Sequence, residues 1–360
     1  MRILYFSGFI SFLVCAAGLP LVQRLARSFG LYDAPGPLKI HQRPISRIGG
    51  AAMMAGLLVS YLLFFASAAW IYMVPILVFG VVWAMGLMDD VKSLPSYARF
   101  CIHIAAGAAL WFAGWRLDLF PQSFWDLIAT CLFVAFAINS INLLDGMDGL
   151  APSLAVVASL GFLVLSLASS NPMQIVVASA LLGICAGMLT VNAPPAKMFM
   201  GDSGSTLIGI VLAFLSLNWI KSRPDEHSIL VPLIFLAIPF ADVVAAILRR
   251  ARSRASLFSG DRRHFYDLLL RRGWTVNQIL NAAVGCSCVL VLVGWLCARH
   301  LLPPEIAVAL VLSCEVGIAL ALGSLRPETS TQSKPQHTHG ESLEHLDAAP
   351  FSAGDGNVNL

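Results

Sequence analysis

The chain has 360 residues, of which 58% are hydrophobic and only 12% charged, and its formal net charge is +3. Soluble domains carry roughly 25% charged residues, so this composition excludes a soluble enzyme, argues against a nucleic-acid partner and is typical of an integral membrane protein. The eight cysteines all lie in or beside apolar runs without a Cys-x-x-Cys pair, which indicates small core residues and not metal ligands or disulfides.

Apolar runs long enough to cross a bilayer, roughly 20 residues each, recur along the chain. The predicted fold class is therefore an all-α integral membrane protein, a polytopic bundle of about 11 transmembrane helices in one domain, residues 1–325. Residues 326–360 have few large apolar side chains and are predicted to form a disordered cytoplasmic tail. The predicted helices lie near residues 3–23, 48–68, 72–88, 100–115, 124–141, 152–169, 174–191, 204–220, 229–248, 278–298 and 304–323.

The distribution of basic residues predicts which loops face the cytoplasm. The loops reached after the first predicted helix, together with the tail, hold 18 of the 23 Lys and Arg residues. The positive-inside rule makes this side cytoplasmic, and the polar motifs described below all lie on it. The five basic residues of the other side are Arg2, Arg116, Lys221, Arg223 and Arg299.

The first cytoplasmic loop supplies Lys39 and His41, with Arg43 and Arg47, just before a predicted helix. These side chains suit contact with a phosphate, although a positive-inside loop without a ligand would have the same composition. Lys39 and His41 are the two that we predict to bind substrate.

Two adjacent carboxylates, Asp89 and Asp90, end the third predicted helix. Adjacent carboxylates repel unless a cation lies between them, and Mg²⁺ is held by one or two carboxylates plus substrate phosphates. The alternative is a solvated helix end. We predict that both residues are catalytic and bind the metal, orienting a metal-bound water or an acceptor phosphate.

The stretch from Asn139 to Leu150 places polar side chains at every third residue. Residues three apart lie on neighbouring positions of a helix face, so the four side chains are predicted to form one polar surface. We predict that this surface holds a nucleotide, whereas a glycine-terminated helix with a polar tip is the simpler interpretation. The four predicted nucleotide-binding residues are Asn139, Asn142, Asp145 and Asp148.

Asp202 lies between two glycines just before the eighth predicted helix. A helix N-terminus favours anions, and Ser203 and Ser205 are predicted to cap it. Asp202 is predicted to be a catalytic, direct Mg²⁺ ligand, with an ordinary helix cap as the alternative.

The last long loop, residues 249–277, holds eight arginines and no lysine. The planar arginine fork matches phosphate oxygens, so Arg262 and Arg263 are predicted to bind substrate, although attraction to anionic lipid explains part of the run. His264, beside them, is a candidate acid or base. Asp242, inside the ninth apolar run, is expected to have a partner, and Arg249 lies two turns away.

Together and in this order, these elements resemble the polyprenyl-phosphate N-acetylhexosamine-1-phosphate transferases, the membrane enzymes that start bacterial cell-envelope glycans. The resemblance covers nearly the whole chain before the tail. The elements that carry it are the loop of residues 33–50, Asp89-Asp90, Asn139-x-x-Asn142-x-x-Asp145-Gly-x-Asp148-Gly, Gly201-Asp202-x-Gly204-Ser205, Pro239-x-x-Asp242 and Asp261-Arg-Arg-His264.

The resemblance implies transfer of a sugar-1-phosphate from a UDP-sugar to undecaprenyl phosphate at the bacterial inner membrane, with release of UMP. It implies Mg²⁺ or Mn²⁺ as cofactor. The implied partners are the bilayer and the two substrates, and a homodimer is the assembly expected if the chain self-associates. An acceptor phosphate is already anionic at neutral pH, so direct in-line attack is favoured over an aspartyl-phosphate intermediate.

One departure concerns the sugar. Where many relatives carry His-x-His-His, this chain reads His264-Phe-Tyr-Asp267, and Gly260 replaces a usual proline. Tyr266 offers an aromatic face and Asp267 an acceptor, which suggests a 6-deoxy N-acetylhexosamine of an O-antigen-like polysaccharide; simple packing of the loop is the alternative.

Two other classes of membrane protein are alternatives. A membrane prenyltransferase also uses aspartate clusters and Mg²⁺, but Ser93 stands where its motif requires another aspartate. An ion-coupled transporter should place acids near the bilayer midplane, whereas the motif acids other than Asp242 lie at one surface.

Overall fold

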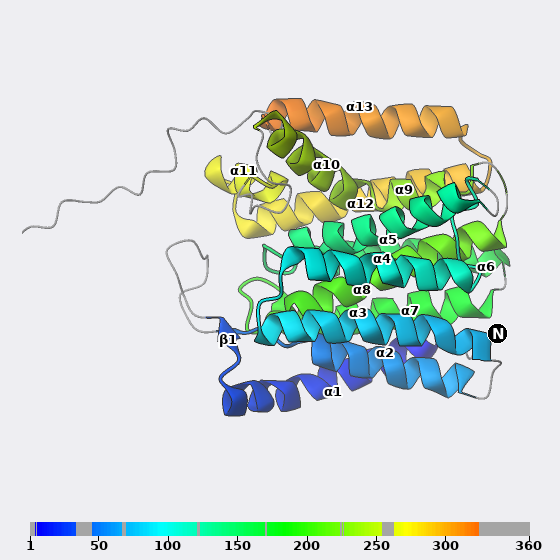
Figure 1. The fold of residues 1–360 in the computed structure, drawn as a ribbon. Helices are drawn as coiled ribbons and strands as arrows, with labels where there is room; N and C mark the ends of the chain where they lie inside the picture. The colour runs from blue at the N-terminus through cyan, green and yellow to red at the C-terminus, as the bar shows by residue number, and fades with distance from the viewer. Residues whose placement is uncertain are drawn as a thin grey trace, which may run out of the picture.

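The computed structural model describes residue 4 and residues 6–33, 45–66, 70–120, 123–169, 171–223, 225, 227–253 and 263–323. Figure 1 shows long helices that run side by side, with the small β1 strand and α11 at the same end of the bundle. The helices are α1 (Phe6–Phe29), α2 (Gly50–Phe65), α3 (Met73–Val91), α4 (Ser96–Phe112), α5 (Phe124–Leu144), α6 (Leu150–Ser169), α7 (Pro172–Asn192), α8 (Gly201–Ser222), α9 (Leu230–Phe235), α10 (Ala237–Arg252), α11 (Phe265–Arg271), α12 (Val276–Ala298) and α13 (Pro304–Leu322), with a 3₁₀ turn at Trp70–Tyr72.

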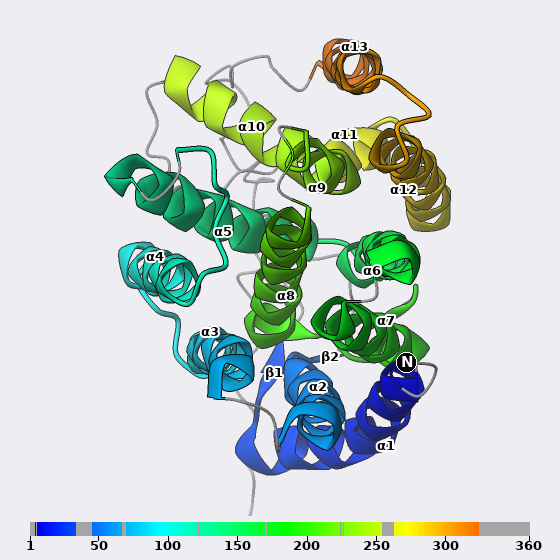
Figure 2. The ribbon, with the colours of Figure 1, turned by 90° about the vertical axis from the view of Figure 1, so that its right-hand side faces the viewer.

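The bundle is organised around α8, which lies in the middle of the view in Figure 2. Residues Ser203–Ile220 of this helix are all buried, and it packs on α2, α3, α5, α6 and α7. Helices at the rim, in contrast, expose large apolar side chains such as Phe9 on α1 and Leu320 on α13. A helix that is apolar on every side needs an apolar environment on every side. For α8 that environment is protein, and for α1 and α13 it is lipid.

The prediction of an all-helical membrane protein is confirmed, and the described residues contain seven helices that are long and apolar enough to cross a membrane. They are α1, α3, α5, α7, α8, α12 and α13, while α2 and part of α6 are shorter apolar helices. The chain is therefore a polytopic helical membrane protein.

The expected single helix over residues 229–248 is wrong, because the chain breaks at Leu236 into α9 and α10. Pro239 stands in the first turn of α10. Proline has no N–H to donate and its ring clashes with the carbonyl four residues earlier, so a continuous helix through Phe235 and Pro239 is disfavoured. The break separates a short inner helix from α10.

The residues just before α2 are tied to the start of α8. Tyr32–Asp33 (β1) pairs antiparallel with Ile45–Ser46 (β2), and the Ser46 carbonyl accepts a hydrogen bond from the Phe199 N–H at 2.8 Å. The N–H groups of Gly49 and Gly50 then donate to the carbonyls of Phe199 and Met200. These bonds hold β1 and β2 at the same end of the bundle as Asp202.

Glycines allow α3 to approach α8 closely. A Cβ atom added at Gly86 would lie 2.6 Å from both the Asp202 carbonyl oxygen and Thr206 Oγ1. Contacts this short do not occur between a real Cβ and its neighbours, so a larger residue would push the two helices apart. Gly86 therefore positions the end of α3 against the first turn of α8.

We predict that Gly86→Ala lowers the thermal unfolding temperature of the detergent-solubilised protein. The obstructing Asp202 carbonyl is backbone and cannot rotate away, so the cost should be about 1–3 kcal/mol. Gly80→Ala on the same helix is the matched control, because its added Cβ would be 3.8 Å from Met54 Cε and meet only ordinary contact. Equal melting temperatures for the two variants would contradict this packing argument.

Candidate active site

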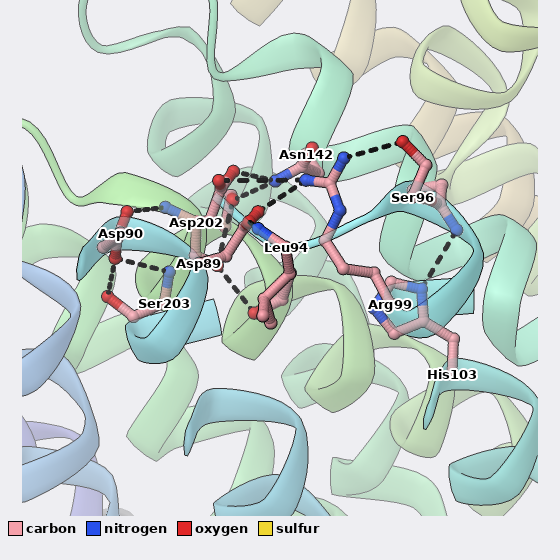
Figure 3. A network of polar contacts seen from close by, with 12 residues as sticks. Asp89, Asp90, Leu94, Ser96, Arg99, His103, Asn142, Asp202 and Ser203 are labelled. Carbon is pink, nitrogen blue, oxygen red and sulfur yellow. Dashed lines mark hydrogen bonds and ion pairs between the residues drawn. The ribbon is translucent and has the colours of Figure 1, made fainter. Parts of the chain in front are cut away.

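The site is built on the first turn of α8, which Asp90 holds from the end of α3. Asp90 Oδ1 accepts a hydrogen bond from the Asp202 N–H at 2.8 Å, and Oδ2 accepts from the Ser203 N–H at 3.0 Å and the Ser203 hydroxyl at 2.7 Å (Figure 3). Asp90 is only 2% exposed. A buried carboxylate is stabilised here by the unpaired N–H groups and positive end of a helix.

The prediction that Ser203 and Ser205 cap α8 is therefore wrong. The cap comes from another helix, and the Ser203 hydroxyl donates to that cap instead of accepting from the backbone. Both Asp90 oxygens already accept hydrogen bonds from protein donors. This arrangement gives Asp90 a structural function. It disfavours the predicted role of Asp90 as a metal ligand, because its oxygens are already used by protein donors.

Asp89 points the other way and pairs with Arg99 of α4. Its Oδ2 lies 2.6 Å from Arg99 Nη1, and its Oδ1 accepts the Leu94 N–H at 2.5 Å. The same Arg99 nitrogen lies 3.9 Å from Asp202 Oδ2 (Figure 3). The guanidinium thus bridges the carboxylates of Asp89 and Asp202, which come from different helices.

Asn142 is the predicted nucleotide residue that joins the acidic group directly. Its amide donates to Asp202 Oδ1 at 2.6 Å and to Ser205 Oγ at 2.9 Å. Asn142 lies inside α5, whereas the sequence pattern predicted a loop from residue 142. The amide fixes the Asp202 carboxylate while leaving its second oxygen, Oδ2, toward Arg99.

Asn139 and Asp148, two of the other predicted nucleotide residues, have hydrogen-bond partners of their own. Asn139 donates to the Ala135 carbonyl at 2.6 Å and contacts His103 Nδ1 at 3.1 Å. Asp148 accepts the Ala196 N–H at 2.9 Å and so holds the loop before α8. Asn139 and Asn142 both lie on α5, whereas Asp145 and Asp148 follow in the turn after Leu144. Nucleotide binding by these four residues stays a prediction.

Asp145, directly after α5, is a carboxylate to which the described residues donate no side-chain hydrogen bond. Its residue surface is partly open to solvent, yet its carboxyl group lies among the other acids. Burial, followed by the negative charges of Asp202, Asp90 and Asp148, raises the pKa of Asp145 well above its ordinary value. A cation placed among these acids would relieve that repulsion.

His264 forms a second constellation with Asp242. His264 Nδ1 lies 2.5 Å from Asp242 Oδ2, and the other Asp242 oxygen accepts the Phe265 N–H at 2.9 Å. Both side chains are buried. Asp242 therefore pairs with the histidine of the last loop, and the expectation of Arg249 as its local partner was wrong, because the loop returns to α10.

Tyr266 connects this pair to the end of α5. Its ring stacks on His264 with centroids 5.5 Å apart, and its hydroxyl donates to the Leu143 carbonyl at 3.3 Å. A Cβ at Gly146 would clash with the Tyr266 hydroxyl oxygen, so glycine makes this approach possible. The contact brings the His264 segment beside the turn that carries Asp145.

The geometry does not support the expected sugar contacts of Tyr266 and Asp267. Tyr266 is 5% exposed and one ring face meets His264, while Asp267 Oδ2 accepts the His264 N–H at 3.3 Å as part of a helix cap. Both side chains have packing or capping partners within the protein. The residue pattern that suggested a deoxysugar is thus accounted for by local structure.

Of the remaining predicted substrate residues, Arg263 is the one that the structure describes. Arg263 donates to the Gly323 carbonyl at 3.2 Å, which ties the last loop to the end of α13. Lys39, His41 and Arg262 lie outside the described residues.

Arg99 and His103 belong to the site although the sequence patterns did not single them out. His103 is 2% exposed and its Nε2 has no hydrogen-bond partner among the described residues, while Arg99 lies one helical turn before it on α4. Their spacing could have revealed them. An arginine and a histidine four residues apart lie on one face of a helix, and these two lie in the helix that follows Asp89-Asp90.

The acidic residues fit a divalent cation that is completed by substrate. Among the described residues no three His, Cys, Asp or Glu side chains stand close enough to enclose an ion by themselves. Mg²⁺, however, is usually bound by one or two carboxylates plus phosphate oxygens and waters. Asp202 and Asp89 meet that requirement, since a guanidinium already bridges them and the negative charge of Asp145 lies nearby.

Comparisons with known proteins cover the segment that carries this site. Residues 70–220 match the family described as Glycosyl transferase family 4. This segment runs from the turn before α3 to the end of α8 and includes Asp89, Asn142 and Asp202.

Three curated relatives are each 29% identical to the chain. A Bacillus subtilis (strain 168) protein named "Probable undecaprenyl-phosphate N-acetylglucosaminyl 1-phosphate transferase" aligns over 73% of this chain and 76% of its own length. The Escherichia coli (strain K12) undecaprenyl-phosphate alpha-N-acetylglucosaminyl 1-phosphate transferase aligns over 82% and 84%. A Mycobacterium tuberculosis (strain CDC 1551 / Oshkosh) decaprenyl-phosphate N-acetylglucosaminephosphotransferase aligns over 72% and 74%. These comparisons agree with the resemblance found in the motifs: residues 70–220 match glycosyl transferase family 4, and most of the chain is similar to polyprenyl-phosphate N-acetylglucosamine-1-phosphate transferases.

Proposed function

We propose that the protein transfers N-acetylhexosamine-1-phosphate from a UDP-N-acetylhexosamine to undecaprenyl phosphate, which produces UMP and a diphosphate-linked lipid. The observation that carries the proposal is the meeting of Asp89 and Asp202, from α3 and α8, around the Arg99 guanidinium at one end of a membrane bundle. The relatives, whose names specify polyprenyl phosphate and N-acetylglucosamine 1-phosphate, support this reaction class.

The reaction exchanges one phosphoanhydride for another. An oxygen of the lipid phosphate forms a bond to the sugar-bearing phosphorus, and the bond from that phosphorus to the bridging oxygen breaks, so that UMP leaves with the electron pair. Such transfers require positioning and neutralisation of charge more than covalent catalysis. Mg²⁺ or Mn²⁺ held by Asp202 and Asp89 would supply a Lewis acid at the diphosphate.

The surrounding residues position this centre. Asn142 fixes the Asp202 carboxylate, and Asp90 fixes the helix turn on which Asp202 stands. We propose that Arg99 serves as a counter-ion to the carboxylates before substrate binds and contacts a phosphate afterwards, because a planar guanidinium forms paired hydrogen bonds to either anion. Asp242 orients His264 at the neighbouring loop.

We further propose that the active site faces the cytoplasm of the bacterial inner membrane, where nucleotide sugars are made, and that the product starts a surface polysaccharide. The sequence distribution of Lys and Arg supports this orientation. The acceptor lipid can approach from the bilayer, since α10, which carries Asp242, exposes Val244 and Leu248.

We predict that purified protein with undecaprenyl phosphate and Mg²⁺ releases UMP from UDP-N-acetylglucosamine. Mass spectrometry of the lipid should show a diphosphate-linked N-acetylhexosamine. UDP-QuiNAc, UDP-FucNAc and the muramyl pentapeptide donor complete the panel and identify the preferred sugar. Hydrolysis of the donor without lipid product, or the absence of UMP with every donor, would contradict the proposed transfer.

We predict that Asp202→Asn lowers kcat/KM by at least about 100-fold, the scale of losing a main electrostatic contact to the transition state. The asparagine side chain retains an oxygen for Asn142 but has no charge for a cation, so folding should persist and the melting curve should be near that of wild type. Asp118→Asn, at the opposite end of the bundle and paired with Arg116 at 2.8 Å, is the control and should keep full turnover. Turnover of the Asp202 variant within a few-fold of wild type would show that Asp202 does not hold the proposed cation.

We predict that Asp145→Asn raises the melting temperature at neutral pH without divalent cations, although it lowers activity. The pKa of Asp145 is raised in the folded protein, so the folded state binds the extra proton between the ordinary carboxyl range and that raised pKa. Wild-type stability should therefore rise as the pH falls through this window, and the variant should lose this dependence. A variant that melts with the same pH dependence as wild type would show that Asp145 is not crowded by its neighbours.

A further inference from the structure

A cavity lies at the opposite end of the bundle from Asp202. It has a volume of about 360 Å³ and is lined by Trp219, Arg223, Trp295 and Arg299, with Leu165 and Val164 of α6 as an apolar wall. Arg223 directly follows α8, whose 22 residues span about 33 Å at 1.5 Å per residue. The cavity is therefore separated from the acidic site by the full length of α8.

The arginines converge from two helix ends. Arg223 is the C-terminal cap of α8 and Arg299 that of α12. Only five Lys and Arg residues fall on this side of the predicted topology, and two of them line this one cavity. Attraction to the negative helix C-termini stabilises each arginine singly, but it does not account for their meeting at one hollow.

The side chains are preorganised for a ligand. The Trp219 indole is 3% exposed and donates to the Ser228 carbonyl at 3.1 Å, so its ring is fixed in place. The Arg223 guanidinium lies over this ring, 5.4 Å from its centroid. Such a cation–π contact holds the fork without using its hydrogen-bond donors. Those donors remain available to an oxygen-rich anion.

The acids that the structure describes form no ion pair with the two arginines, Arg223 and Arg299. Asp225 is close in sequence, but its Oδ1 accepts the His227 N–H at 3.0 Å. By contrast Arg116, at the same end of the bundle, is paired with Asp118 at 2.8 Å. The cavity thus presents two arginine forks to which the described residues offer no anion.

The setting points to the chemistry of the ligand. Tryptophan is enriched at both faces of the membrane, where helices meet the headgroup layer. Arginine binds phosphate oxygens in a bidentate manner. Val164 is 38% exposed beside the arginines, so an acyl chain can leave the site along the apolar surface of α6.

We propose that the cavity between the ends of α6, α8 and α12 binds the phosphate of an anionic phospholipid through Arg223 and Arg299. This site does not depend on the transfer reaction at the other end of the bundle, and the bound lipid would join the ends of three helices that differ in how deeply they are buried.

Native mass spectrometry of the full-length protein in detergent tests this proposal. The protein is titrated with phosphatidylglycerol or with phosphatidylcholine of the same acyl chains. Wild type should retain phosphatidylglycerol preferentially. At roughly 1 kcal/mol per arginine near a lipid phosphate, Arg299→Gln should weaken retention about fivefold and the Arg223→Gln/Arg299→Gln double variant about thirtyfold.

Arg116→Gln is the matched control, because Arg116 has the same charge at the same end but already has a carboxylate partner. It should bind phosphatidylglycerol as wild type does. The single Arg299→Gln variant keeps the test valid if the double variant misfolds, since Arg299 is exposed and its replacement leaves the buried packing of α12 in place.

Three results would overturn the proposal. Equal retention of the two phospholipids would show that no anionic headgroup is selected. Unchanged retention in Arg299→Gln, with its melting curve intact, would place the lipid elsewhere. Displacement of phosphatidylglycerol by inorganic phosphate, or preferentially by undecaprenyl phosphate, would assign the cavity to a free anion or to the acceptor lipid.

Discussion

The N–H groups in the first turn of a helix have no partner within that helix, and α8 begins inside a bundle where little water can reach them. Asp90 satisfies two of these groups from the end of α3. An unpaired buried carboxylate would be costlier still than the unpaired N–H groups, so the pairing stabilises both sides. This one interaction holds α3 and α8 in the relative position that the rest of the site requires.

The neighbouring residue shows how the same constraint supports chemistry. Because Asp90 is turned toward α8, the adjacent Asp89 is turned toward α4 and meets Arg99. Asp202, one residue into α8, then lies between Arg99 and Asn142. Adjacent acids in the sequence thus have separate functions: one builds the helix junction, and the other joins the group of charges that we assign to phosphoryl transfer.

The side chains around the two ends of α8 carry opposite charges. Its N-terminal end lies among carboxylates, and its C-terminal end lies beside the two arginines of the cavity. Residues Ser203–Ile220 of this helix are buried among close-packed neighbours, which oppose bending of the helix between its ends. The headgroup site that we propose would therefore fix the opposite end of the element that carries Asp202.

The sequence by itself determined the membrane class, most of the helices and the acids that matter, because a 20-residue apolar run is long enough to span a bilayer and a carboxylate inside one is too costly to lack a partner. Local patterns also singled out Asn142, Asp202 and His264, which the structure places in two polar clusters. Only the tertiary structure decided which side chains meet. Asp90 and Ser203 are 113 residues apart and Asp242 and His264 are 22 apart, and such pairs depend on helix packing and on the break before α10. The spacing of residues along one segment contains no information about a partner from another segment, which is why the predicted cap at Ser203 and the local partner suggested for Asp242 were wrong.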